Sequence, residues 1–151
     1  MRIVIGKAAR VLVLYDGDRM LLQARIALGR EPIGAKRREG DGRTPEGLYF
    51  LCLEKERGKY GLSLGLSYPN VEDAQAAFAN GIIDAGVLRA IVDAANDRRR
   101  PPWGTLLGGE IYLHEGPTDQ DWTQGCIALA PKDMAVLWQC RQVIESVVIR
   151  P

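Results

Sequence analysis

The chain has 151 residues, of which 46% are hydrophobic and 26% charged, and its 20 basic and 19 acidic side chains leave a net charge of +1. This length and apolar content suit a single domain over residues 1–151, and the balanced charge argues against nucleic acid or an anionic membrane surface as the main partner. A single His excludes zinc sites that need two or three imidazoles, three widely spaced Cys exclude Cys₄ and C-x-x-C sites, and we expect no metal and no cofactor.

The N-terminal third has the pattern of β-strands. Apolar runs at residues 10–15 and 19–28 flank Asp16-Gly17-Asp18, and an Asp-Gly step between such runs predicts a β-hairpin. The unbroken apolar run at residues 47–53 predicts another strand, buried on both faces. Residues 29–46 contain four Gly and two Pro, which predicts a loop, and a long ordered loop in a small domain is often functional.

The rest of the chain alternates helices with short strands. Asn70 is a good N-cap for a helix that ends near Asn80-Gly81, and Pro131 is acceptable in the first turn of the last helix. The predicted elements here are helices over residues 70–80, 84–96 and 130–144 and strands over residues 110–114 and 146–149. Strands followed by helices and further strands predict an α+β fold with a mostly β core.

The sequence contains no apolar run approaching the ~18 residues of a membrane span. The N-terminal segment does not resemble a signal peptide, because Lys7 and Arg10 interrupt its apolar run before a hydrophobic region forms. A cytosolic location, another export route and a leader removed before residue 1 all stay open. The odd number of Cys argues against a disulfide framework.

The three Cys differ in their surroundings. Cys52 lies within an apolar run and Cys140 shares a helical face with apolar residues, so both are expected to fill the core. Cys126 lies at a loop-to-strand edge directly after Gly125, which allows close approach of a ligand to the backbone. The N–H groups of Gly125 and Cys126 are then candidates for stabilising an oxyanion, although a structural Cys after a turn explains the same local pattern equally well.

His114 ends a short apolar strand, twelve residues before Cys126. A lone His is most often a surface group or a satisfied core group. A strand, a loop and a returning strand can nevertheless bring the two side chains together, and a thiol with a pKa of ~8.5 needs a base at neutral pH. An adjacent imidazole gives a thiolate–imidazolium pair and later supplies a proton to a leaving amine. No other imidazole exists in this chain.

Three segments in the right order resemble the L,D-transpeptidase (YkuD-type) catalytic domain. The first is His114-Glu115-Gly116 followed, after a spacer, by Thr123-Gln124-Gly125-Cys126-Ile127. The second is Lys36–Tyr49, which resembles the family's Lys, Gly-Asp and Thr-Pro-x-Gly-x-Tyr segment. The third is Gly61–Asn70 followed by Asp73, which resembles a subgroup with Tyr-Pro-Asn before a helix. Together they span most of the chain, from about residue 11 to residue 138.

The resemblance implies a YkuD-like β-sandwich with a few helices packed on it, and acyl transfer on peptidoglycan stem peptides in cell-wall biogenesis and cell shape. The thiolate attacks the carbonyl of the third residue of a tetrapeptide stem, the terminal D-alanine leaves, and an amine of a second stem takes the acyl group. By this resemblance Cys126 is the nucleophile and His114 the base and then the acid. The N–H groups of Gly125 and Cys126 hold the oxyanion, and the backbone carbonyl of Glu115 orients the imidazole.

The resemblance also suggests residues that contact the substrate. Lys36 and Arg43 lie in the Gly-rich loop and are candidates for contacting a substrate carboxylate or an anionic wall polymer. Tyr68, before Pro69, is either a packed loop aromatic or a wall of the substrate site. The remaining substrate-binding candidates are the motif residues Gly116, Thr123 and Gln124.

The chain departs from the family pattern in three places. Gln124 stands where a His often precedes Gly-Cys, Ala128 stands where many members have Arg, and the spacer between His114 and Cys126 is short. These departures keep a second hypothesis open, in which water takes the acyl group and the protein is a carboxypeptidase or amidase on wall peptides. A third is a non-catalytic wall-binding domain. The resemblance implies the cell envelope or periplasm.

Overall fold

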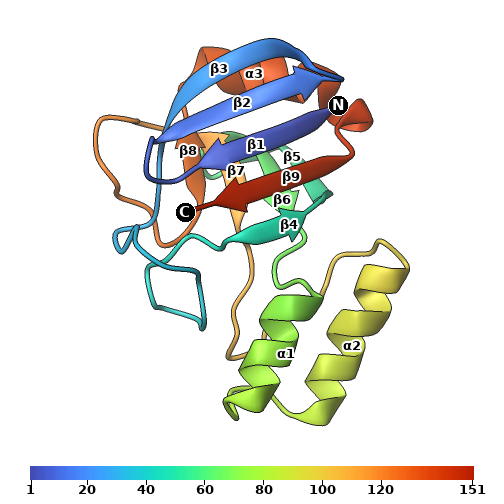
Figure 1. Ribbon diagram of the computed structural model, residues 1–151. Helices are drawn as coiled ribbons and strands as arrows, with labels where there is room; N and C mark the ends of the chain where they lie inside the picture. The colour runs from blue at the N-terminus through green and yellow to red at the C-terminus, as the bar shows by residue number, and fades with distance from the viewer.

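The computed structural model describes residues 1–151 as one nine-stranded sheet, bent into two layers, with three α-helices (Figure 1). The strands follow the order β4-β9-β1-β2-β3-β8-β7-β6-β5. Their bounds are β1 Arg2–Gly6, β2 Val11–Asp16, β3 Arg19–Ala27, β4 Gly47–Tyr49, β5 Leu51–Gly58, β6 Gly61–Leu66, β7 Tyr112–Glu115, β8 Ile127–Leu129 and β9 Ser146–Arg150. The predicted α+β, mostly β sandwich with a few helices is confirmed.

The first layer contains β4, β9, β1, β2 and β3 (Figure 1). Buried and exposed residues alternate along its inner strands because successive side chains point to opposite faces of a strand. The buried positions include Ile3 and Ile5 on β1 and Leu12 and Leu14 on β2. β2 and β3 form the predicted hairpin, and β9, which pairs in parallel with β1, is the predicted closing strand.

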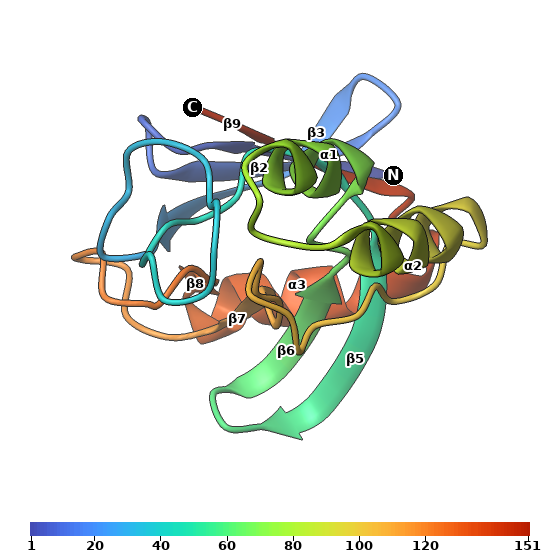
Figure 2. The same cartoon turned by 90° about the horizontal axis from the view of Figure 1, so that it is seen from below.

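The second layer contains β8, β7, β6 and β5, and β3 joins it to the first. β7 and β8 pair in parallel, with His114 opposite Ala128. The β5–β6 hairpin projects from the body of the molecule, as the view from below shows (Figure 2). This layer carries both residues of the predicted catalytic pair, so its register fixes where they meet.

The structure has three α-helices, of which two pack against each other below the sheet and the third packs against β3, β6 and β7 (Figure 1). They are α1 Val71–Ala79, α2 Ala85–Asn96 and α3 Pro131–Cys140. Asn70 and Asp73 form a reciprocal capping box at the start of α1, and Asp84 caps α2. These helix starts match the sequence predictions. No helix is long and apolar enough to cross a membrane.

Three element predictions need correction, and two strands were missed. The run at residues 47–53 is not one doubly buried strand: β4 pairs with β9 while β5 pairs with β6, and Leu48 is 59% exposed. The strand predicted at 110–114 begins at Tyr112 because Glu110 has a left-handed backbone (φ 54°), which a strand does not accommodate. The last helix ends at Cys140 and continues only as a 3₁₀ turn. β1 and β6 were not predicted.

Candidate active site

A tight turn held by Thr123 places Cys126 directly before β8. The Thr123 hydroxyl accepts the Gly125 N–H (3.1 Å) and donates to the Cys126 carbonyl (2.7 Å). Thr123 is buried, and its own backbone N–H donates to the Leu28 carbonyl. The turn is therefore anchored to the segment after β3, and Thr123 positions the thiol through the backbone of the turn.

Gly125 is required by this turn for two reasons. Its φ of +136° is a conformation that side chains rarely adopt, and a Cβ built there lies 2.7 Å from the Arg43 carbonyl oxygen. We expect Gly125→Ala to lower the free energy of unfolding by about 3 kcal/mol and to reduce the accessibility of Cys126. Thermal unfolding measures the first effect, and alkylation of Cys126 measures the second.

Gly81→Ala is the matched control for that variant. Gly81 also has a positive φ (+71°), but nothing lies within 4 Å of its built Cβ. We expect it to cost only about 1 kcal/mol, from backbone strain alone. Equal losses in the two variants would show that the contact with the Arg43 carbonyl is unimportant.

His114 lies on β7 with its imidazole oriented by the backbone. Its Nδ1 is 2.8 Å from the Glu115 carbonyl oxygen. A carbonyl only accepts hydrogen bonds, so the proton of the neutral ring is on Nδ1 and Nε2 is left with a free lone pair. The Glu115 side chain faces away and accepts the Leu62 N–H (3.2 Å). Glu115 therefore contacts the imidazole through its backbone carbonyl and not through its side chain.

Two aromatic residues that the sequence did not indicate enclose the imidazole. Tyr60, at the tip of the β5–β6 hairpin, stacks on His114 with ring centroids 4.6 Å apart, and Trp122 meets it edge-on at 5.7 Å. Together they leave His114 only 3% exposed, and this burial lowers the pKa of its imidazole. Nothing in the local sequence marks Tyr60, because it reaches the site through the pairing of β6 with β7.

Two adjacent cavities share Cys126 and His114. The larger, of about 320 Å³, is also lined by Arg30, Lys36, Glu39, Thr123 and Gln124. The smaller, of about 270 Å³, lies along the β5–β6 hairpin and is also lined by Lys55, Ser63 and Tyr112. Tyr60, Lys59 and Glu110 border both. A substrate therefore has room on two sides of the thiol.

The Cys126 thiol is held by backbone groups in this structure. Its Sγ accepts the Tyr112 N–H and donates to the Glu110 carbonyl, each at 3.4 Å. Burial raises the pKa of the thiol, while the Tyr112 N–H and the charge of Lys36 act in the opposite direction. Burial therefore acts against charge on both groups, because it lowers the pKa of the imidazole and raises the pKa of the thiol.

The predicted oxyanion donors are corrected at one position. The Gly125 N–H is already bonded to the Thr123 hydroxyl. The backbone N–H groups of Cys126 and Gln124 have no hydrogen-bond partner. The Cys126 and Gln124 N–H groups are therefore free to donate to a ligand, whereas Gly125 contributes the shape of the turn.

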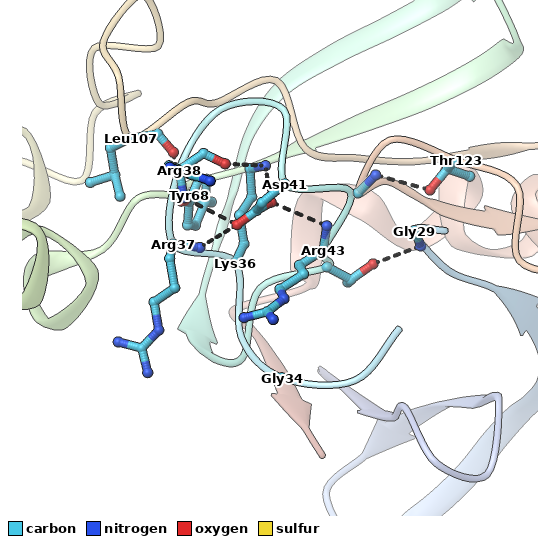
Figure 3. A network of polar contacts seen from close by, with 12 residues as sticks. Gly29, Gly34, Lys36, Arg37, Arg38, Asp41, Arg43, Tyr68, Leu107 and Thr123 are labelled. Carbon is cyan, nitrogen blue, oxygen red and sulfur yellow. Dashed lines mark hydrogen bonds and ion pairs between the residues drawn. The ribbon is translucent and has the colours of Figure 1, made fainter. Parts of the chain in front are cut away.

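Asp41 organises the loop over residues 29–46 (Figure 3). Its carboxylate accepts from the Lys36 ammonium (3.0 Å) and from the backbone N–H groups of Arg37, Arg38 and Arg43. Burial acts to raise the pKa of Asp41, but these hydrogen bonds outweigh it and hold the pKa below its usual value. Lys36 lines the larger cavity, yet its ammonium is 2% exposed and also donates to the Arg38 carbonyl. It provides charge to the cavity wall from a fixed position.

Three predicted substrate contacts lie elsewhere. Tyr68 is fully buried and donates its hydroxyl to the Leu107 carbonyl, so it is the packed aromatic and not a cavity wall (Figure 3). Arg43 packs its guanidinium toward Gly34 and lines neither cavity. Gly116 gives room to Trp122, because a Cβ there lies 2.7 Å from the Trp122 ring. Thr123 and Gln124 do line the larger cavity.

Ala128 also has a structural explanation. The Cβ of Ala128 and the ring of Trp122 both approach Gly116, at 3.4 and 2.7 Å from its built Cβ. The small side chain at position 128 leaves this space to the indole, which meets His114 edge-on.

No group of three or more His, Cys, Asp or Glu is arranged to hold a metal ion.

The YkuD family profile, described as the L,D-transpeptidase catalytic domain, matches residues 1–149. The chain belongs to the YkuD family. Comparison with curated proteins gives no match. In this YkuD domain His114 lies on β7, and Cys126 directly precedes β8, the parallel neighbour of β7.

Solved structures share the fold of this YkuD domain. Pgp2 from Campylobacter jejuni, described as a helical cell shape determining protein, matches with a TM-score of 0.66 and 24% identity over 98% of this chain and 46% of that one. An L,D-transpeptidase from Mycobacterium smegmatis matches with a TM-score of 0.56 and 11% identity, over 99% of this chain and 58% of that one. Bd1075 from Bdellovibrio bacteriovorus matches with a TM-score of 0.55 and 20% identity, over 99% of this chain and 47% of that one. The chain thus spans about half the length of these proteins.

Proposed function

We propose that this chain is a Cys-dependent acyltransferase, an L,D-transpeptidase of peptidoglycan stem peptides, formed as one catalytic domain over residues 1–151. The observation that carries the proposal is that Cys126 and the oriented imidazole of His114 line the same two cavities of a YkuD domain. A nucleophile, a base with a free Nε2 and unpartnered N–H groups beside the thiol are the parts that acyl transfer needs.

The first half-reaction forms a thioester. His114 Nε2 takes the proton of Cys126 as Sγ attacks the carbonyl carbon of the third residue of a tetrapeptide stem. The Cys126 and Gln124 N–H groups stabilise the oxyanion. The imidazolium then gives its proton to the nitrogen of D-alanine, the C–N bond breaks, and D-alanine leaves.

The second half-reaction reverses these roles. An amine of a second stem attacks the thioester, His114 takes its proton, and the C–S bond breaks to return Cys126. If water attacks instead, the products are a tripeptide and D-alanine, and the domain is an L,D-carboxypeptidase. The exposed side chain of Gln124 at the larger cavity leaves this cavity open to either acceptor.

The proposal places the protein in the cell envelope, where wall peptides are found. The family acts on the wall, and the structurally similar Pgp2 is described as a determinant of helical cell shape. We propose a related role in wall shape for this chain.

One experiment separates these functions. The protein is incubated with a disaccharide tetrapeptide, and both the intact protein and the products are measured by mass spectrometry. We expect a thioester on Cys126 and a cross-linked dimer. Tripeptide and D-alanine without dimer would indicate the carboxypeptidase. If neither an acyl-enzyme nor a product forms, the domain is a non-catalytic wall-binding module.

A further inference from the structure

The smaller cavity contains an unexplained polar group. Tyr112 lines it, and the Tyr112 hydroxyl is the one buried side-chain nitrogen or oxygen in the molecule without a hydrogen-bond partner. Buried polar groups in folded proteins almost always have a partner, so an exception beside a nucleophile points to a partner that arrives with a ligand. The hydroxyl is not used in the mechanism proposed above.

The strand register places a basic side chain on the same face. Lys55, Ser63 and His114 stand opposite one another across β5, β6 and β7. Tyr112 is two residues before His114 and so lies on that same face. Its neighbour across the ladder is Gly65, and the Trp103 ring packs edge-on against the phenol with ring centroids 5.7 Å apart.

The Tyr112 phenol and the nearby charge of Glu110 raise the pKa of Lys55, so its ammonium stays charged without an ion-pair partner. Its Nζ lies 4.8 Å from the centroid of the Tyr112 ring, and it forms no salt bridge with any Asp or Glu. The cavity also holds the ammonium of Lys59 and the carboxylate of Glu110, so two positive charges face one negative charge. A neutral hydroxyl donor and a free ammonium together match a carboxylate.

We propose that Tyr112 and Lys55 form a binding site for the C-terminal carboxylate of the residue that leaves the acyl donor. This inference rests on the function proposed above. Adjacent strands lie about 4.8 Å apart, so Lys55 starts about 10 Å from His114 on this face. One residue spans about 3.8 Å, and the lysine side chain covers the remaining distance. The preferred donor is then a stem that ends one residue beyond the scissile bond with a free carboxylate.

A pair of thiol reagents tests the site without any wall peptide. N-iodoacetyl-D-alanine carries the carboxylate, and N-iodoacetyl-D-alaninamide has a neutral amide in its place. Both form a thioether with Cys126 and release iodide. We measure each rate on the Cys126 peptide by mass spectrometry, apart from Cys52 and Cys140, and take the ratio of acid to amide. The ratio cancels any change in the reactivity of the thiol itself.

We expect Lys55→Met to lower this ratio about tenfold and Tyr112→Phe to lower it about threefold, because the ammonium adds a charge–charge attraction to the carboxylate that the neutral hydroxyl lacks. Lys55→Arg should restore most of it. Lys132→Met, on the exposed start of α3, is the control and should leave the ratio unchanged. A ratio that stays within twofold of the wild type in both Lys55→Met and Tyr112→Phe overturns the proposal.

The alkylation experiment distinguishes failure of the carboxylate site from failure of the proposed function. If the wild type makes no product from a tetrapeptide but its alkylation ratio depends on Lys55, the carboxylate site stands and the peptidoglycan assignment fails. If the tetrapeptide reacts but the ratio does not depend on Lys55 or Tyr112, the assignment stands and the carboxylate site fails. In an active protein, kcat/KM for a tetrapeptide ending in D-alaninamide should be well over tenfold lower than for the free acid in the wild type, and only about threefold lower in Lys55→Met, where Tyr112 remains.

Discussion

Replacement of Cys126 by Ala is expected to abolish the acyl-enzyme and to lower kcat/KM on a tetrapeptide stem by about 10⁴-fold or more, because no other Cys lines the two cavities. The fold should survive, since the thiol bonds only the Tyr112 N–H and the Glu110 carbonyl. Product formation and intact mass after incubation with substrate measure the loss, and thermal unfolding verifies the fold.

The two remaining thiols provide matched controls. Cys52 is half-buried on β5, where burial raises its pKa to about 11, and Cys140 bonds the carbonyls of its own helix α3. Neither lines a cavity that contains His114. Cys52→Ala and Cys140→Ala should therefore form the same acyl-enzyme as the wild type. Full activity in Cys126→Ala would contradict both the transpeptidase and the carboxypeptidase hypotheses.

Replacement of His114 by Gln is expected to lower kcat by about 10²–10⁴-fold with little change in KM. Gln keeps a polar group near the Glu115 carbonyl but cannot take the proton of Cys126 or pass it to the leaving amine. Steady-state kinetics on a tetrapeptide measure the two parameters separately. A large rise in KM at constant kcat would assign His114 to substrate binding instead of proton transfer.

The pH dependence follows from the burial of the imidazole. Only the neutral ring accepts the thiol proton, so activity is present above the pKa of His114 and is lost as the pH falls through it. Burial under Tyr60 and Trp122 lowers this pKa from its ordinary value of 6.5, so the acid limb of kcat/KM should have its midpoint below pH 6.5. Tyr60→Ala exposes the imidazole and should move the midpoint of the acid limb to higher pH. Tyr60→Phe keeps the stacked ring and should leave the midpoint unchanged. An acid limb that is unmoved in Tyr60→Ala would exclude this cause.

Patterns local in the chain could be predicted from the sequence. The hairpin at residues 11–27, the N-caps Asn70 and Asp84 and the start of α3 depend on turn and capping chemistry within a few residues. The long run at residues 47–53 was misread because an apolar run does not show that the chain changes its partner strand at Phe50. β6 was missed because its Gly and Ser residues lack the β-branched side chains typical of strands.

The sequence by itself determined the chemistry available to this protein: one imidazole, one Cys in a Gly-Cys turn and the motif order of the YkuD family. Only the tertiary structure decided how these groups are surrounded. The parallel pairing of β7 with β8 and the antiparallel pairing of β6 with β5 and β7 bring Tyr60, Tyr112 and Lys55 to the two residues of the motifs. The fold also buries Tyr68, whose hydroxyl donates to the Leu107 carbonyl. These contacts join residues far apart in the chain, and strand register, which local patterns do not encode, sets them.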